Sequence, residues 1–255
     1  MGGTRRRAGP GFVLFGAALM ATVLAVEAPA IPLVTPPLPP SMSLLQRVQV
    51  APGAAELAAY SGLHAAAAGG DIAEIGRLVA AGADLEARDR HGRTPLMVAG
   101  FQRDHDAARA LIAAGADVNA LENAHYDLLT IAGVLDDLAM VELAIAAGAD
   151  TGLVTSPYLG TALIAAAHLG HVEVVRALIA GGAPLDHVNN LGWTALIETI
   201  VLGDGGPRHT AIVADLIAAG ADIDLADLNG HRPLAIARLW GLTEIANLLE
   251  AAGAR

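Results

Sequence analysis

Two histidines three positions apart, His168 and His171, come closest in this sequence to a metal-binding pattern. Imidazole nitrogens are common zinc ligands, but a stable site needs at least about three protein ligands. The chain has no cysteine, and no carboxylate completes the HisLeuGlyHis motif. We therefore expect no metal and no cofactor, and we expect most of the histidines to be structural or solvated.

Candidate nucleophiles and acid–base pairs are equally scarce. All 15 basic residues are arginines, so the chain lacks the lysine of a phosphate-binding loop or a Schiff base, and it lacks a thiol nucleophile. None of the four serines lies in a GxSxG setting. Asp136 and Asp137 are adjacent, so their carboxylates should point apart, as at a solvated helix start. The sequence predicts that the protein is not an enzyme.

Composition indicates a helical protein that does not bind nucleic acid. Apolar residues make up 54% of the chain but aromatic residues only 3%, which favours closely packed helices with small side chains. The formal net charge of −11 repels phosphate groups, and the sequence has no basic stripe to overcome that repulsion.

The first 30 residues have the pattern of an export signal. Arg5, Arg6 and Arg7 precede an apolar run of 16 residues, 11–26, and a small-x-small cleavage motif follows at 28–30. This run is slightly shorter than the ~17–25 residues that span a bilayer. We expect a periplasmic protein; the alternative is an uncleaved anchor that holds residues 11–26 in the inner membrane.

A proline-rich stretch separates this signal from the rest of the chain. Six prolines fall between positions 29 and 40, where they favour an extended polyproline II conformation. We interpret residues 31–52 as a linker and residues 53–255 as the folded domain.

That domain consists of a unit repeated six times. The phrase LeuxAlaAlaGlyAlaAsp, complete or in part, places a glycine at intervals of 33, 33, 34, 38 and 33 residues. The glycines are Gly82, Gly115, Gly148, Gly182, Gly220 and Gly253. A second series, in register with the first, contains a small or polar residue two places before a leucine. Its members are Ser61, Thr94, Asp127, Thr161, Thr194 and Arg232. Two registered series at one period indicate a repeat architecture.

Each unit reads as two short helices and an extended finger. Thr94 can cap a first helix with Pro95 at its first position, and residues 107–112 have the spacing of a second helix. Gly115 can end the second helix in the left-handed conformation. The chain then turns through a finger before the next first helix.

These motifs resemble the ankyrin repeat. The resemblance rests on AspArgHisGlyArgThrProLeu at 89–96 and GlyAlaAspValAsnAla at 115–120, and it covers residues 57–255. It implies an all-α solenoid of six helix-turn-helix repeats with β-hairpin-like fingers, used mainly to bind other proteins through its concave face. The chain is similar to exported bacterial ankyrin proteins. In this family, His64 matches a histidine that ties neighbouring repeats together.

Departures from the pattern are informative. The starts of the repeats at Ser61 and Asp127 differ from ThrProLeu, so we expect looser helix starts there. One extra residue falls in the finger 155–160, and five fall at 204–208, between the helices of the fifth repeat. Insertions in solenoids map to loops, often on the working surface, so either segment is a candidate contact for a partner.

Candidate partner-binding residues follow from the alignment of the repeats. The family usually places partner-facing side chains at the two positions before the inter-helix turn, and here they are mostly apolar. The residue just before each first helix adds further candidates, several of them aromatic. Glu198 is a carboxylate where other repeats have Val, Ile or Ala, and it is placed either to hold a partner's cation or to swing into solvent. The candidates are Phe101, Tyr126, Leu135, Tyr158, His168, Trp193, Glu198, Leu202, His231 and Trp240.

An exported module that binds an envelope protein is the function these observations favour. The alternative is a protective or immunity factor that shields a periplasmic enzyme or toxin. Both functions would use the same concave face. For the candidate residues themselves the alignment leaves a further alternative open: the Val and Leu pairs pack between repeats, and only the aromatic rings are exposed.

Overall fold

The computed structural model describes residues 50–255, which contain one short helix followed by six helix pairs. The helices are α2 (Ala54–Ala59), α3 (Gly62–Gly69), α4 (Ile72–Ala80), α5 (Pro95–Gln102), α6 (His105–Ala113), α7 (Leu128–Val134), α8 (Leu138–Ala146), α9 (Ala162–Leu169), α10 (Val172–Ala180), α11 (Ala195–Leu202), α12 (Pro207–Ala219), α13 (Pro233–Leu239) and α14 (Thr243–Ala251). The predicted export signal and most of the predicted linker lie outside the described residues.

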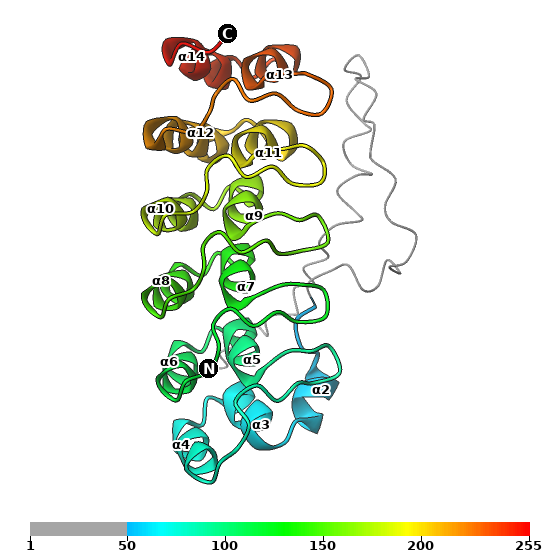
Figure 1. Cartoon of the computed structure of the whole chain (residues 1–255), viewed down its shortest axis with the longest axis vertical. Coiled ribbons are helices and arrows are strands. Elements are labelled where there is room, and N and C mark those ends of the chain that lie inside the picture. The colour runs from blue at the N-terminus through cyan, green and yellow to red at the C-terminus, as the bar shows by residue number, and fades with distance from the viewer. Residues whose placement is uncertain (1–49) are drawn as a thin grey trace, which may run out of the picture.

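The pairs stack along one axis into a solenoid (Figure 1). The first helices, from α3 to α13, form one row, the second helices form another, and the fingers extend from the row of first helices on the side away from the second helices. We call the surface made by the first helices and the fingers the inner face. The expectation of an all-α solenoid with six repeats is confirmed.

A single hydrophobic cluster, from Leu63 to Leu249, runs the length of the solenoid. Fully buried alanines such as Ala67, Ala99 and Ala132 recur in the first helices, where their small side chains let neighbouring helices approach closely. This packing explains how a chain with few aromatic residues builds a continuous core. Within residues 50–255, no helix combines the length and the apolar character that a membrane crossing requires.

Side-chain caps fix most of the first helices. Thr94, Thr161 and Thr194 each accept a hydrogen bond from the amide three residues on. Asp127 does the same, with 2.8 Å from its Oδ1 to the amide nitrogen of Thr130, so the prediction of a loose start at Asp127 is wrong. A carboxylate is as good a cap as a threonine hydroxyl. At Ser61 the prediction is right, because its side chain makes no capping hydrogen bond.

Left-handed glycines end the second helices as predicted. All six glycines of the repeat series have φ between 81° and 100°. His64 also behaves as the family resemblance implies: its Nε2 lies 2.9 Å from the carbonyl oxygen of Arg93 in the next repeat.

Each finger is a tight loop closed by one backbone hydrogen bond. In four fingers this bond joins residues four apart: Asp89 to Arg93, Glu122 to Tyr126, Asn189 to Trp193, and Asp227 to His231. In the remaining finger it joins Thr155 to Gly160, five apart, which confirms the position of the extra residue.

Backbone hydrogen bonds also link the tips of successive fingers. The amides of Asn123, Ser156 and Asn190 donate to carbonyl oxygens of the preceding finger at 2.9, 2.8 and 2.9 Å. No such bond joins the fingers 189–193 and 227–231, although both are fully described. Leu228, which takes the place of Asn123 and Asn190, is 71% exposed.

The five extra residues of the fifth repeat form more than a loop. Helix α12 has 13 residues, whereas each of the other second helices has nine, so part of the insertion forms an extra helical turn that begins at Pro207. His209 anchors this turn: its Nδ1 lies 2.7 Å from Asp204 Oδ1, and its Nε2 lies 3.0 Å from the carbonyl oxygen of His168. The insertion is therefore tied to α9.

Asp137 differs from its predicted role. Its side chain is 3% exposed, caps α8 by accepting from the amide of Met140, and lies 2.8 Å from His105 Nε2 in the preceding repeat. Arg103 Nε adds an ion pair at 3.3 Å. The expectation of a solvated carboxylate is therefore wrong for Asp137 and right for Asp136, which is exposed.

Asp137→Ala should lower the free energy of unfolding by about 2 kcal/mol, because the substitution removes a helix cap and leaves His105 without its partner. Asp137→Asn keeps the cap and should lose about half as much. Urea unfolding followed by circular dichroism measures both values. Asp106→Ala, on an exposed surface pair, is the control and should leave the midpoint unchanged. Equal midpoints for Asp137→Ala and Asp106→Ala would contradict this role.

Candidate functional site

The candidate site is the inner face, where five of the predicted residues form a row. Each lies at or just after the end of a first helix and is partly exposed, so the row has one member for each of the last five repeats. The five residues are Phe101, Leu135, His168, Leu202 and Trp240. Leu239, next to the last of them, is 47% exposed.

Tyr126 belongs to a second, smaller apolar cluster beneath this row. Its ring packs with Met97 and Ile131, while Phe101 and Leu135 lie against the cluster from outside. The prediction of an exposed Tyr126 is wrong, since it is only 9% exposed, and burial raises the pKa of its hydroxyl above the usual value. Tyr126 therefore supports Phe101 and Leu135 rather than presenting its ring to a partner.

Trp193 is also buried, at 8% exposure, and it belongs to the main core. Its amide donates to Asn189 Oδ1 at 3.0 Å, which folds the finger back on the start of α11. The position before a first helix is thus at the base of a finger, where a large ring is enclosed. The prediction of surface exposure is wrong here for the same reason as at Tyr126.

Glu198 faces a finger, not solvent. The residue is 6% exposed, and its Oε2 accepts from Asn189 Nδ2 at 3.0 Å. Its Oε1 lies 3.5 Å from Nδ1 of His168 on the neighbouring first helix. The sequence predicted that this carboxylate would either bind a partner's cation or face solvent. In the structure the protein's own groups occupy both of its oxygens instead.

The histidines do not gather into a metal site in the described part of the chain. His168 faces Glu198, whereas His171 places Nδ1 2.8 Å from the carbonyl oxygen of Gly133 as it begins α10. Among residues 50–255, no group of three or more potential ligands is arranged to hold a metal ion.

The fingers contribute the two remaining candidates. Tyr158 is partly exposed in the widened finger, and its carbonyl oxygen accepts the tip-to-tip hydrogen bond from Asn190. His231 is partly exposed beside Asp227, with 3.3 Å between its Nδ1 and Oδ2.

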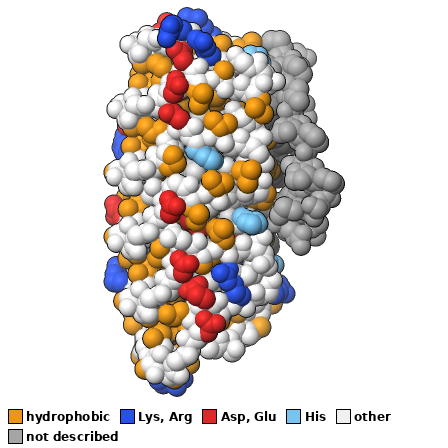
Figure 2. All heavy atoms as spheres, in the orientation of Figure 1, with side chains coloured by type: hydrophobic (Ala, Val, Ile, Leu, Met, Phe, Trp, Pro, Cys, Tyr) orange, Lys and Arg blue, Asp and Glu red, His pale blue; other side chains and the backbone are white. Residues whose placement is uncertain are grey.

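Sequence reasoning missed apolar residues near the finger tips. Leu159, Val188 and Leu228 are 53%, 44% and 71% exposed. The sequence feature that could have indicated this exposed apolar residue is the leucine at 228, where two other fingers have asparagine. Figure 2 shows apolar side chains spread over the central repeats, beside acidic side chains that follow one another along the solenoid.

The largest feature that sequence reasoning missed is at the first finger. Arg93, at the equivalent of Tyr126 and Trp193, is 1% exposed. Its guanidinium lies 2.7 Å from Asp89 Oδ2 and 2.6 Å from Glu56 Oε1, and it donates to the hydroxyl of Tyr60 at 3.1 Å and to the carbonyl oxygen of Val50 at 2.7 Å. Helix α2 thus covers the start of the inner face.

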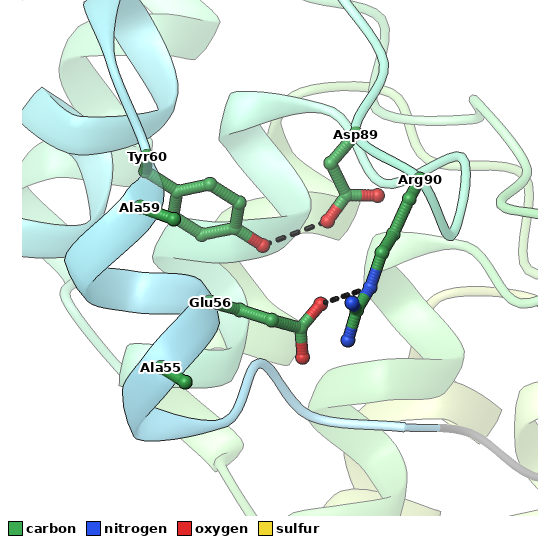
Figure 3. A pocket seen from close by; sticks show the side chains of 6 residues that line it. All are labelled: Ala55, Glu56, Ala59, Tyr60, Asp89 and Arg90. Carbon is green, nitrogen blue, oxygen red and sulfur yellow. Dashed lines mark hydrogen bonds and ion pairs between the residues drawn. The ribbon is translucent and has the colours of Figure 1, made fainter.

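The carboxylates at this corner are held ionised. Burial acts to raise the pKa of Asp89, but the hydrogen bonds from Tyr60 and Arg93 outweigh it and lower the pKa below the usual value. Glu56 shows the same balance, with burial opposed by the amide of Gly53 and by Arg93, and its pKa is also lowered. Burial and the bond to Asp89 raise the pKa of Tyr60. Figure 3 shows the Tyr60–Asp89 and Glu56–Arg90 contacts.

Helix pairs, left-handed glycines and linked fingers define a class of repeat protein, and the comparisons identify it. A family model described as ankyrin repeats (3 copies) matches residues 43–122 and 129–227. The chain belongs to the ankyrin repeat family. Ankyrin repeats are protein–protein interaction modules, and the fold is typically a non-enzymatic scaffold.

Individual relatives agree with this assignment. A putative ankyrin repeat protein, YahD of Escherichia coli (strain K12), is 38% identical over 190 residues, which are 74% of this chain and 94% of the relative. The crystal structure of an ankyrin repeat domain from Acinetobacter baumannii AYE has 48% identity and a TM-score of 0.73 over 76% of this chain and 98% of that one.

A third similar chain comes from a complex. It belongs to a structure of a predatory endopeptidase from Bdellovibrio bacteriovorus with an immunity protein. The similarity is 27% in sequence with a TM-score of 0.63, over 75% of this chain and 98% of that chain.

Glu198→Ala should lower the free energy of unfolding by about 2 to 3 kcal/mol, because it leaves Asn189 without its acceptor and a void between α11 and the finger. Glu198→Gln, which keeps the size and an acceptor oxygen, should lose less than about 1 kcal/mol. Thermal and urea unfolding measure the losses. Glu142→Ala, on the exposed side of α8, is the control. A Glu198→Ala protein as stable as this control would show that the carboxylate is free for a partner after all.

Proposed function

We propose that this protein is exported and binds a protein of the cell envelope through its inner face. The supporting observation is the row of partly exposed side chains at the ends of the first helices, four of five of which are apolar. Partly exposed apolar side chains that recur along a solenoid are favourable to bury, and each side chain covered by a partner contributes on the order of 1 kcal/mol.

The row has supports that make it suitable for binding. Tyr126 and Ile131 hold Phe101 and Leu135 from beneath, and tip-to-tip hydrogen bonds fix the first four fingers beside them. A surface whose side chains are already positioned loses little entropy when a partner covers it. Tyr158, Leu202 and Trp240 extend the same surface toward the C-terminal repeats.

Export is supported by the sequence pattern alone. The arginines at 5–7, the apolar run 11–26 and the small-x-small motif at 28–30 favour a signal peptide, and an uncleaved anchor would also place the repeats outside the cytoplasm. In either case the partner would be an envelope protein.

A second candidate function is protection of a periplasmic enzyme or toxin. It is favoured by the likeness to a chain in the complex of a predatory endopeptidase with an immunity protein. Such a factor would use the same row of side chains, but it would block the activity of the protein that it covers.

Export predicts that the chain made in a Gram-negative host fractionates with the periplasm, shortened by the signal if it is cleaved. Osmotic shock followed by mass spectrometry of the intact protein measures both properties. A variant with Arg5, Arg6 and Arg7 changed to glutamine should stay cytoplasmic and unprocessed. A full-length wild-type chain in the soluble cytoplasm would contradict export.

Photo-crosslinking tests the binding surface. A photoreactive phenylalanine analogue at Phe101, Leu202 or Trp240 should crosslink one envelope protein in living cells, because these side chains point to the partner. The same analogue at Glu142 or Glu173, on the exposed side of the second helices, is the matched control. Equal crosslinking from both faces, or none from the inner face, would contradict the proposal.

The same experiment separates the two candidates. Once the crosslinked protein is identified, it is purified and mixed with this chain at equal molar amounts. A hydrolase that loses at least about tenfold of its activity in the complex would favour the protective factor, whereas an unchanged activity or a non-enzymatic partner would favour a scaffold.

A further inference from the structure

We propose that the corner at Arg93 is the N-terminal end of the partner-binding surface and binds an acidic segment of the partner. In this structure α2 occupies the corner as an intramolecular stand-in for that segment. This inference rests on the proposed function, because it assigns chemistry to one end of the same inner face.

The contacts of Arg93 divide unequally between the solenoid and the N-terminal segment. Among its side-chain partners, Glu56, Tyr60 and Val50 all belong to residues 50–60, and only Asp89 belongs to the repeats. Arg90 adds a second guanidinium, 3.1 Å from Glu56 Oε1. Two arginines thus converge on one carboxylate at the edge of the inner face, in a chain whose net charge is −11.

Helix α2 is weakly held apart from these polar contacts. It has six residues, none of them buried, and a helix this short is not stable on its own in water. A hollow of about 320 Å³ remains between α2 and the first finger, lined by Ala55, Ala59, Tyr60 and Asp89 among others (Figure 3). The helix therefore rests mainly on hydrogen bonds and ion pairs beside a partly unfilled space, together with the contact between the rings of Tyr60 and His64, whose centroids lie 5.3 Å apart.

Release of α2 would remove most of the hydrogen-bond partners of Arg93 and would expose its side chain. The guanidinium of Arg93, which is 1% exposed with α2 in place, would retain one carboxylate, Asp89, and would open toward solvent next to the start of α5. An arginine in this position is suited to a carboxylate because its planar fork can donate two parallel hydrogen bonds.

The stand-in indicates what the partner segment resembles. Glu56 and Tyr60 are four residues apart, so a helix presents both on one face, with the carboxylate on Arg93 and the hydroxyl on Asp89. We infer that the partner presents a helical turn with a carboxylate and, four residues later, a tyrosine or another hydroxyl donor. Beyond it, the partner should be apolar, to match Phe101 and Leu135.

A labelled peptide that copies residues 50–61 tests this inference without the partner. In wild-type full-length protein, α2 competes at the high effective concentration of a tethered ligand, so peptide at tens of micromolar should not bind. In the full-length Glu56→Gln/Tyr60→Phe variant the tethered copy is weakened, and fluorescence anisotropy should show at least tenfold tighter binding of the wild-type peptide. Glu142→Gln is the matched control and should behave as wild type.

Two further measurements complete the test. A peptide with glutamine at the position of Glu56 should bind the double variant at least tenfold more weakly. Hydrogen exchange on the same proteins should show faster exchange across α2 in the variant, while α5 and α7 remain protected in both.

The proposal is overturned if the double variant binds the wild-type peptide no better than wild-type protein does, if the glutamine peptide binds equally well, or if α2 stays as protected in the variant as in wild type. Because no partner protein is used, these outcomes are independent of the crosslinking result, and a failure of either experiment leaves the other interpretable.

Discussion

Burial of small apolar faces between successive helix pairs is the interaction on which this structure depends. One pair cannot enclose its own apolar surface, so each repeat uses its neighbours as the other half of its core. The alanines of the first helices permit this at close range, and the same cluster continues from Leu63 to Leu249 without interruption. Everything on the inner face is positioned by that stack.

Several of the buried polar groups join elements across repeat boundaries. Asp137 connects α8 to His105 of the preceding repeat, and Glu198 connects α11 to His168 of the preceding repeat. Arg93 does the same between the first finger and α2. A buried charge is tolerated only where partners satisfy it, so these residues fix how adjacent parts meet rather than adding much net stability.

The repeat period, the helix caps and the left-handed glycines could be predicted from the sequence, because they depend on residues within one unit. The exposure of single side chains could not. Tyr126, Trp193 and Glu198 occupy aligned positions that look superficial in one repeat, but the finger and the next helix enclose them. The short helix at 54–59 was missed because it lies before the first repeat and follows no period.

The row of residues in the proposed binding surface is therefore predicted in outline from the sequence, and the exposure of its neighbours is corrected by the structure. Phe101, Leu135, Leu202 and Trp240 lie where the alignment placed them, at the ends of first helices. Tyr126 and Trp193, which were expected to be exposed beside them, are instead buried. Leu228 and the corner at Arg93 add features that only the three-dimensional arrangement brings together.

The tip-to-tip hydrogen bonds give the two ends of the inner face different mechanical character. Three backbone hydrogen bonds join the first four fingers into a continuous strip, so that displacement of one finger also displaces the next. The fifth finger has no such backbone link; Leu228 lies against Gly192 of the fourth finger, and α13 and α14 pack on α11 and α12. A protein bound to the inner face would therefore contact a rigid surface along the first four fingers and a more deformable one near Trp240.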